Sequence, residues 1–410
     1  MAKSFVNVNT MSTVMIIAGE SSGELYGSLL ARSLKRALPD VRLLGVGGER
    51  MREAGVELIA RTSDAFGLTE AVSAYGKIRE AFRRTVKALR EHRPDVLVLI
   101  DYPDFNLKVG SIASSLGIRI LYYVSPQIWA WRKGRIKKIA RLVDRMAVIL
   151  PFEEDIYRTA GVSCEFVGHP ILEEISAVLG KESFGTQDSS LGESFTMNPQ
   201  IRAESRSLLG LDPETPILSL LPGSRPSELT RHLPLLLNVV RKFKTDPATA
   251  HYRLCMPLSS NTDEGRYASW LSGFRDEGVH IHKGETVRTL AASDIAVVAS
   301  GTATLQTALL EVPMVVIYKL SPLTYQLGKL ILDVRHISLV NILSGREVVT
   351  ELIQERADTE TIMGELKKII SDTKYREGMR ESLRNVREPF LGKTPSDRVA
   401  GMVIELAGGG

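Results

Sequence analysis

The stretch IAVVASGTATLQTALLEVPMVVIY, residues 295–318, holds two apolar runs of strand length separated by a segment that begins Ser-Gly-Thr. We predict a strand, a helix and a second strand in that order, which is the unit of a parallel α/β sheet. The first backbone N–H groups of such a helix point outward and carry partial positive charge. The turn at residues 299–303 therefore suits a bound anion, or it is a small-residue helix cap.

The same alternation of apolar runs and helical patterns extends along the whole chain. Continuous apolar strands are typical of sheets buried on both faces, so we predict two parallel α/β domains covered by helices. Residues 181–205 are polar and rich in Gly and Ser, which is typical of a flexible segment near a domain boundary. The predicted strands are TVMIIA, VRLLGVG, VLVLID, ILYYVS, MAVIL and CEFVG, followed by ILSLLPG, YRLCMPL, VHIHK, IAVVAS and MVVIY.

Length and composition indicate an ordinary globular protein with a large core. The chain has 410 residues, of which 44% are hydrophobic, and this length favours two or three domains. Its two cysteines, Cys164 and Cys255, are too far apart for a zinc motif and too few for a disulfide framework. We read TVMIIA as the first strand rather than a secretion signal, and no apolar run is long enough to span a bilayer. These features favour a cytoplasmic protein.

Basic residues concentrate in two segments, although the net charge is only +4. One lies between Lys77 and Arg90 and the other between Arg132 and Arg141. Apolar residues recur at helical spacing through 68–89, which predicts an amphipathic helix with a basic polar face. That face is either an ordinary solvated surface or a surface for anionic lipid head groups.

The segment AGESSGELYGSLL, which begins at Ala18, follows the first predicted strand. Gly19 and Gly23 permit a tight turn, and Ser21 or Ser22 can cap the helix that follows. We interpret the segment as a loop facing a nucleotide or sugar, with a simple capped turn as the alternative.

Two later segments of the first half carry possible catalytic or binding side chains. VLVLIDYPDF places Asp101 at the carboxyl end of a strand, where a carboxylate can accept a proton from a hydroxyl nucleophile, and Asp104 suits a helix cap. In SPQIWAWRKGR, Trp129 and Trp131 are either core anchors or a platform for an apolar or sugar ligand.

The segment LPGSRPSEL, residues 221–229, forms a second strand-to-helix turn in the C-terminal half. Gly223 allows close approach of a ligand, Ser224 is a donor, and the planar fork of Arg225 suits phosphate. An isolated arginine is usually a surface residue, but a second Gly-Ser turn in the same half favours a binding function.

Several function classes lack their motifs. GVGGER ends in Arg50 where a dinucleotide fingerprint has glycine, and the chain has neither a P-loop nor a GxSxG elbow. His280 and His282 share a strand face without further ligands at metal-binding spacing. No compact aromatic and basic module indicates nucleic-acid binding. The remaining pattern favours group transfer.

These motifs together resemble the lipid-A-disaccharide synthase family. The resemblance implies a GT-B fold, with two Rossmann-like domains facing across a cleft. It implies a membrane-facing acceptor domain over 1–200, a UDP-sugar domain over 201–385, and a helical segment, 386–410, that returns to the first domain or to a partner's. The similar segments are AGESSGE, GVGGERM, PDVLVLIDYPDFN, YYVSPQIWAWRKGRIKKI, LPFEEDIY, FVGHP, LLPGSRPSE, ASGTATLQ and ISLVNILSGREVVTELIQ.

The resemblance also implies a reaction and a location. UDP-2,3-diacylglucosamine and 2,3-diacylglucosamine 1-phosphate (lipid X) would form a β-1,6 disaccharide and UDP. An α-linked donor that gives a β product requires inversion by one in-line displacement. The enzyme would lie peripherally on the cytoplasmic face of the inner membrane, and a homodimer is possible.

Site roles follow by matching the family motifs to this sequence. Asp101 would be the base, and Arg225 would stabilise the departing diphosphate. No metal or cofactor is expected. Donor-binding residues would be Gly223, Ser224, Arg225, Gly284, Ser300, Gly301, Thr302, Ala303, Gln306 and Asn341, and sugar-facing residues Glu20, Ser22, Gly23, Trp129 and Trp131.

Three positions depart from the family pattern. Gln306 stands where the family usually has a ribose-binding glutamate, and it lacks the charge. Glu24 replaces an aspartate, and Val340 replaces a proline before Asn341. The alternatives are another UDP-sugar enzyme of the same fold, such as a 2-epimerase or an N-acetylglucosaminyltransferase, and a non-catalytic lipid or nucleotide carrier.

Overall fold

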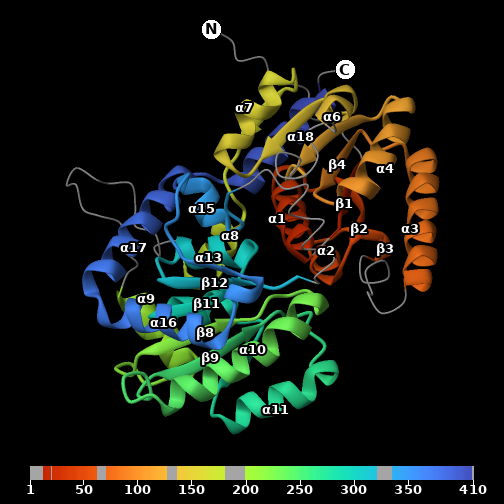
Figure 1. Ribbon diagram of the computed structural model, residues 1–410. Coiled ribbons are helices and arrows are strands. Elements are labelled where there is room, and N and C mark those ends of the chain that lie inside the picture. The colour runs from red at the N-terminus through yellow and green to blue at the C-terminus, as the bar shows by residue number, and fades with distance from the viewer. Residues whose placement is uncertain are drawn as a thin grey trace. The chain divides into compact units, whose positions relative to one another are not determined.

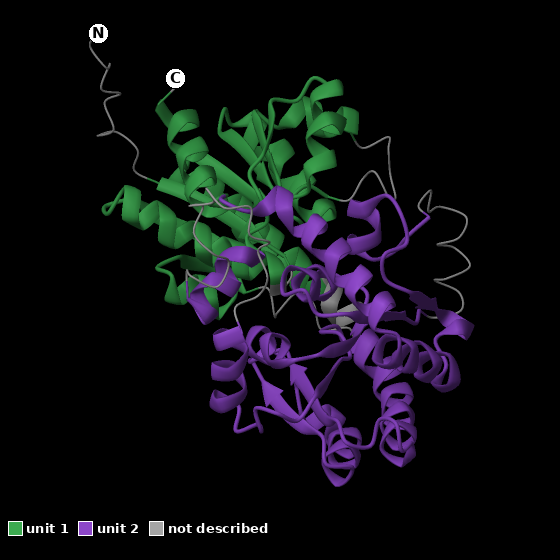
Figure 2. Ribbon diagram, turned by 90° about the vertical axis from the view of Figure 1, so that its left-hand side faces the viewer, with its two compact units in different colours: residues 1–170, 393–410 green, residues 171–392 purple. Residues whose placement is uncertain are grey.

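The computed structural model describes residues 13–19, 21–61, 71–126, 136–180, 199–320 and 335–408. The chain forms two compact units (Figure 2), with residues 1–170 and 393–410 in unit 1 and residues 171–392 in unit 2. The expected boundaries at 200 and 386 thus move to 170 and 392. Helix α8 (Ile171–Leu179) packs on α12 (Thr286–Ala292) and α13 (Thr302–Leu309), so it belongs with the second sheet.

Unit 1 is built on a seven-stranded sheet in the order β3-β2-β1-β4-β5-β6-β7 (Figure 1). Every strand pair is parallel. The central strands β1 and β4 are buried along their whole length, as their continuous apolar sequences require. The strands are β1 (Thr13–Ala18), β2 (Arg42–Gly47), β3 (Glu57–Arg61), β4 (Val96–Ile100), β5 (Arg119–Tyr123), β6 (Arg145–Val148) and β7 (Cys164–Phe166).

Helices cover this sheet, and the last of them comes from the end of the chain. Helix α18 (Pro395–Gly408) packs on α1, β4 and β5 (Figure 1). The C-terminal segment therefore completes unit 1. The other helices of the unit are α1 (Ser21–Ala37), α2 (Glu49–Glu53), α3 (Ala71–His92), α4 (Pro103–Ser115), α6 (Ile136–Leu142) and α7 (Pro151–Thr159).

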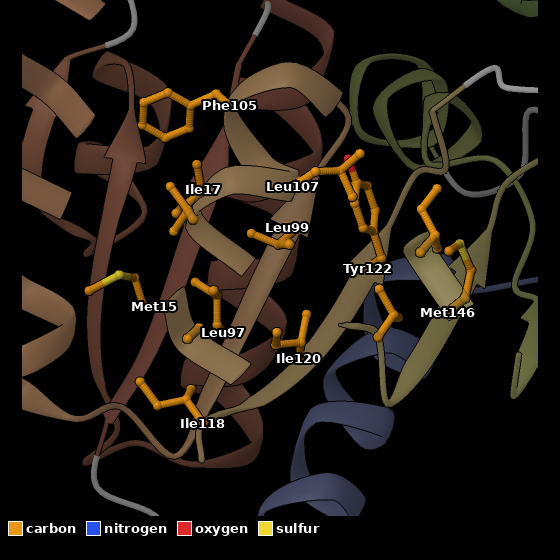
Figure 3. Close-up of a cluster of buried hydrophobic side chains, with 14 of the residues drawn as sticks. Met15, Ile17, Leu97, Leu99, Phe105, Leu107, Ile118, Ile120, Tyr122 and Met146 are labelled. Atoms are coloured by element: carbon orange, nitrogen blue, oxygen red, sulfur yellow. The ribbon is translucent and has the colours of Figure 1, made fainter. Parts of the chain in front are cut away.

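The core of unit 1 shows the period-two alternation of strands (Figure 3). Met15 and Ile17 of β1 lie in one cluster with Leu97 and Leu99 of β4 and with Phe105 of α4. Alternate residues of neighbouring strands therefore share one face of the sheet, and α4 seals it with an aromatic ring.

Unit 2 contains a six-stranded sheet in the order β10-β9-β8-β11-β12-β13, again with all pairs parallel. Strands β8 and β11 are fully buried. The strands are β8 (Ile217–Leu221), β9 (Arg253–Leu258), β10 (His280–Lys283), β11 (Ile295–Ala299), β12 (Met314–Tyr318) and β13 (Glu351–Ile353). The remaining helices are α9 (Pro199–Leu208), α10 (Pro226–Thr245), α11 (Ala268–Asp276), α15 (Leu339–Ser344), α16 (Thr359–Ser371) and α17 (Thr373–Arg387).

Aspartates close the amino ends of strands in both units. Each stands just before a strand, and its Oδ2 accepts a backbone N–H from the first two residues of the neighbouring strand, which satisfies a donor at the sheet end. The pairs are Asp95 with Thr13 (3.0 Å), Asp144 with Ile120 (2.8 Å) and Asp294 with Ile217 (2.7 Å). The opposite, carboxyl ends carry the candidate site residues.

Helix α3 is the amphipathic helix expected from the sequence. All six of its basic residues from Lys77 to Arg90 are exposed, and Glu80 pairs with Arg83 and Arg84. In the described residues, no helix combines the length and apolar character needed to cross a membrane.

Candidate functional site

The turn after β4 holds Asp101 in a strained backbone conformation. Asp101 and Tyr102 have φ angles of 48° and 43°, in the left-handed region that non-glycine residues rarely adopt. The Asp101 N–H donates to the Val124 carbonyl over 3.2 Å. Its own carbonyl accepts from the Tyr122 hydroxyl (2.7 Å) and from Asn106 Nδ2 (2.8 Å). These bonds fix the backbone of Asp101, whose side chain is half-buried at the sheet edge.

Neighbouring turns at this edge share the strain and the tight packing. Val124, after β5, has φ of 62°, which is unusual for a β-branched residue. Gly19, after β1, faces Tyr102 so closely that a Cβ there would lie 2.4 Å from the Tyr102 Cβ. Glycine is therefore required at residue 19 if Tyr102 is to keep its position.

The expected sugar-facing residues fall partly inside the described chain. Glu20, Trp129 and Trp131 lie outside the described residues. Ser22 is half-buried in the first turn of α1. Gly23 is buried, and a Cβ there would make ordinary contacts of 3.6 and 3.7 Å with Ile100 and Ala18. Packing against β1 and β4 therefore leaves room for a Cβ at residue 23.

The Glu24 carboxylate, one of the departures from the family pattern, caps a helix. Its Oε1 accepts the backbone N–H of Arg50 over 2.8 Å. It also lies where a Cβ on Gly48 would come, 2.4 Å away. A carboxylate at the N-terminus of α2 is favoured by the helix dipole. Glu24 therefore joins α1 to α2 with its longer side chain.

Sequence reasoning missed a buried polar cluster at the carboxyl ends of β5 and β6. Glu153, only 1% exposed, accepts the Ser125 hydroxyl (2.7 Å) and the Leu150 N–H (3.2 Å). The Tyr157 hydroxyl donates to the Pro126 carbonyl over 3.3 Å, and burial raises the pKa of Tyr157. The cluster fixes residues 125 and 126. The Pro-x-Glu start of α7 was the available signal for it.

In unit 2, the turn after β8 is organised by a carboxylate that we did not predict. Glu228 Oε2 accepts the backbone N–H groups of Ser224 (3.0 Å) and Arg225 (3.2 Å), forming a cap for α10. Gly223 has φ of 104°, and a Cβ there would lie 2.3 Å from the same oxygen. Glycine is needed at residue 223 for both reasons, and the two N–H groups already bind an anionic oxygen.

The Arg225 side chain remains accessible. It is 55% exposed, and its Nη1 lies 3.8 Å from Glu228 Oε1. An exposed pair at this distance contributes little to stability. The guanidinium is therefore partly exposed to solvent near the carboxyl edge of the sheet.

The turn after β11 differs in part from the expected anion site. The Ser300 N–H donates to the Ile317 carbonyl (2.9 Å), and its hydroxyl donates to the Ile337 carbonyl (3.0 Å). Both donors are therefore occupied within the protein. The expectation for Ser300 is therefore corrected, since its hydrogen bonds hold the turn. For the N–H groups of Gly301, Thr302 and Ala303, the described part of the chain offers no hydrogen-bond acceptor. They form the electropositive start of α13, where Gly301 is exposed and Thr302 and Ala303 are half-buried.

Gln306 is buried and bonded to a carboxylate. It is 6% exposed, and its Nε2 donates to Glu174 Oε2 of α8 over 3.3 Å. A glutamate at residue 306 would place two negative charges together, which is costly in a buried setting. The amide thus fits this chain's Glu174.

Asn341 has a structural role, contrary to our expectation of a phosphate or sugar contact. It is fully buried. Its Nδ2 donates to the Val349 carbonyl and to Glu351 Oε1 (both 2.8 Å). Its Oδ1 accepts the N–H groups of Val348 (2.7 Å) and Val349 (3.0 Å). All four hydrogen-bonding positions of the amide are therefore filled within the protein.

Gly284, also expected near the donor, follows β10 in a left-handed conformation. Its φ is 81° and its N–H donates to the Leu258 carbonyl over 2.8 Å. A Cβ would meet only Ser260 Cβ, at 3.8 Å. Glycine is favoured here by backbone conformation.

The described residues hold no group of three or more His, Cys, Asp or Glu side chains arranged to bind a metal ion. The rings of His280 and His282 are stacked with their centroids 6.3 Å apart, and burial lowers the pKa of both side chains. Cys164 and Cys255 are buried free thiols, and burial raises the pKa of each to about 12.

Comparison with solved structures defines the class. UDP-GlcNAc 2-epimerase from Neisseria meningitidis, bound to UDP-GlcNAc, matches with a TM-score of 0.65 at 10% identity, over 96% of this chain and 100% of that one. The glycotransferase of kitacinnamycin matches with a TM-score of 0.58 at 16% identity, over 97% and 99%. The two α/β units are thus the GT-B fold shared by glycosyltransferases and UDP-sugar epimerases.

The family follows from the sequence comparisons. The model of the lipid-A-disaccharide synthetase family matches residues 14–187 and 190–391, and the chain belongs to that family. It is 41% identical over 395 residues to the lipid-A-disaccharide synthase of Trichlorobacter lovleyi, covering 96% of this chain and 97% of that protein. The corresponding synthase of Geobacter sulfurreducens is 39% identical over 402 residues, covering 98% of each.

Proposed function

We propose that this protein joins UDP-2,3-diacylglucosamine to 2,3-diacylglucosamine 1-phosphate, forming the β-1,6 lipid A disaccharide 1-phosphate and UDP. Membership of the synthase family over nearly the whole chain is the observation that carries this proposal. The positions of Asp101 and Arg225 at the carboxyl ends of β4 and β8 agree with it, because α/β enzymes bind ligands at those ends.

Unit 2 binds the donor in this proposal. The N–H groups at the start of α13, for which the described residues supply no acceptor, and the partly exposed Arg225 guanidinium bind the UDP diphosphate. Negative charge grows on the diphosphate as it leaves, so fixed positive groups stabilise the transition state more than the ground state. Arg225 and α13 supply that charge, and the proposed reaction uses no metal ion or cofactor.

Unit 1 binds the acceptor. Asp101 takes the proton of the acceptor 6-hydroxyl as its oxygen attacks C1 of the donor sugar. The bond from C1 to the UDP oxygen breaks on the opposite side, which inverts the anomeric centre. The rigid turn around Asp101 favours this role, because proton transfer depends on a fixed distance to the hydroxyl.

Both substrates carry acyl chains, so the enzyme must meet a membrane. The exposed basic face of α3 would bind anionic head groups on the cytoplasmic side of the inner membrane. The chain should co-sediment with vesicles containing anionic lipid at low salt. Replacing Arg79, Arg83 and Lys87 with glutamine should abolish this, and retained binding would contradict it. Whether the active form is a homodimer is answered by its mass in solution.

The decisive test is incubation with UDP-diacylglucosamine and its 1-phosphate counterpart, with mass detection of disaccharide and UDP. The structural likeness to UDP-GlcNAc 2-epimerases makes epimerisation the second candidate. An epimerase would change the donor sugar without any acceptor. A carrier would bind both lipids with no product. Either result would replace the proposal.

A further inference from the structure

His232 of α10 is a fully buried histidine that lies outside the site residues assigned above. Buried polar groups are normally hydrogen-bonded, and the two ring nitrogens of His232 both are. Nδ1 lies 2.8 Å from the Pro222 carbonyl oxygen, and Nε2 lies 3.1 Å from the Lys319 backbone nitrogen.

These two partners fix the proton on the ring. The Lys319 N–H can only donate, so Nε2 accepts and carries no hydrogen. The Pro222 carbonyl can only accept, so Nδ1 carries the proton and donates. His232 is thus a neutral imidazole in one tautomer, and burial correspondingly lowers its pKa.

The His232 ring links the turn after β8 to the turn after β12. In the sheet, the turn after β11 lies between these two turns. Pro222 begins the turn after β8 that carries Gly223 and Arg225, and Lys319 follows β12 directly. In the sheet, β8 and β12 are the two neighbours of β11. The end of β11 carries the Ser300–Ala303 turn, which is itself tied to β12 because the Ser300 N–H donates to the Ile317 carbonyl. His232 therefore sets the Arg225 turn in register with the start of α13.

We propose that His232 is a positioning residue for the donor diphosphate: its bond to the Pro222 carbonyl places Arg225 so that the guanidinium and the first N–H groups of α13 act on the same ligand. The inference rests on the donor site proposed above. It adds that α10 contributes a residue which does not touch the ligand.

The competing explanation is a buried histidine that merely fills space and satisfies its own polar atoms. Three variants separate the two. His232→Leu removes both bonds, and His232→Gln places its amide near Nε2, keeping a partner for Lys319 while losing Pro222. His232→Asn places its amide NH2 near Nδ1 and keeps the Pro222 bond. His251→Gln, at an exposed histidine beyond the end of α10, is the matched control.

The measurement is UDP affinity by titration calorimetry, with Tm recorded for each variant. We expect about tenfold weaker UDP binding for His232→Leu and His232→Gln, as for loss of one ordered hydrogen-bonded contact, and near wild-type binding for His232→Asn and His251→Gln. The KM for the donor should rise in parallel, with the acceptor KM unchanged. A space-filling residue would lower Tm and leave UDP affinity intact in the folded protein.

A double-mutant cycle with Arg225→Ala tests whether His232 acts through Arg225. If it does, His232→Leu weakens UDP binding in the wild-type background and has no further effect when Arg225 is alanine. Equal losses in both backgrounds, or no loss in either, overturn the inference while wild-type turnover and the Arg225 effect stand. If wild type binds no UDP, or Arg225→Ala binds it as well as wild type, the donor site itself is wrong. Should His232→Leu not fold, His232→Gln takes its place in the cycle.

Discussion

The turns after β4 and β5 in unit 1 and after β8 and β11 in unit 2 all contain positive φ angles, but at different types of residue. After β4 and β5 in unit 1, left-handed backbone is adopted by Asp101, Tyr102 and Val124. After β8 and β11 in unit 2, the positive φ angles belong to Gly223 and Gly301. Non-glycine residues in this region cost about 1 kcal/mol or more each. The turns after β4 and β5 therefore carry strain that the turns after β8 and β11 avoid, although unit 2 has a non-glycine residue of this kind, Gln354 (φ 55°), after β13.

The difference reflects which part of the residue is used. In unit 2 the groups proposed to bind the ligand at α13 are backbone N–H groups, and glycine exposes them without strain. In unit 1 the proposed chemistry needs a side chain at the turn, so glycine is excluded at residue 101. The hydrogen bonds from Tyr122 and Asn106 to the Asp101 carbonyl then hold the strained turn.

The largest effect should come from Asp101→Asn. The amide keeps the shape of the side chain but cannot accept the hydroxyl proton, so kcat should fall by about a thousandfold. UDP affinity, a property of unit 2 in this comparison, should be unchanged. The measurement is the disaccharide formation rate together with UDP titration.

The matched control is Asp104→Asn, at an exposed carboxylate in the first turn of α4. It should retain most of the activity. Equal losses in the two variants would remove the special role of residue 101, and the strain at that turn would then lack a catalytic reason.

The next largest effect is expected for Arg225→Ala, on the other side of the comparison. Loss of a bidentate contact to phosphate should raise the donor KM by about a hundredfold and leave the acceptor KM unchanged. Arg225→Lys should recover part of the loss, since it restores the charge without the fork. Arg241→Ala, at an exposed arginine of α10 paired with Glu277, is the control. If only the acceptor KM changed, Arg225 would act on the acceptor and not on the donor diphosphate.

Most strands could be predicted because their apolar runs are continuous. The two strands that were missed, β3 and β13, lack such a run. β3 is an edge strand whose residues are half-buried or exposed, so its sequence ELIAR lacks a continuous apolar run. β13 is three residues long and contains Glu351, a buried carboxylate that binds the N–H groups of Ile337 and Ser338. Burial of a charged residue depends on tertiary partners, which a local pattern does not reveal.

The candidate site was predictable where a motif coincides with a strand end. Asp101, Gly223 and Arg225 were predicted in this way, and the structure places them after β4 and β8. Asn341 was misassigned because its four partners come from residues 348–351, and spacing alone cannot show that an amide is already satisfied. His232 was missed because a lone histidine in a helical pattern carries no signal until its two loop partners are known.

Each unit has a buried histidine near the carboxyl edge of its sheet, His169 in unit 1 and His232 in unit 2, and the effect of pH on stability tests the first of them. His169, after β7, is 1% exposed with its ring edge-on to Tyr26, and burial lowers its pKa to about 3. The unfolded chain takes up this proton below about pH 6.5 and the folded one does not, so stability falls as pH drops from about 6.5 towards 3. Between pH 7 and pH 5 the expected loss is about 2 kcal/mol.

The measurement for His169 is Tm at pH 7 and pH 5 for wild type and His169→Gln. The variant should lose less stability on acidification than wild type does. The surface variant His251→Gln should keep the wild-type difference. An unchanged difference in His169→Gln would mean that residue 169 is protonated in the folded state.

The smallest effect is expected at Gly301, after β11. It tests whether glycine is needed there for its backbone conformation or for the space that it leaves. At Gly301 a Cβ would meet nothing within 4 Å, but φ is 150° with ψ of −160°, a conformation almost restricted to glycine. Gly301→Ala should therefore lower stability by about 1–2 kcal/mol and weaken UDP binding. Gly364, exposed within α16, also has open space for a Cβ and no positive φ, so Gly364→Ala should raise Tm slightly. If both variants raised Tm, the turn after β11 would tolerate a side chain, and its glycine would serve ligand approach rather than backbone conformation.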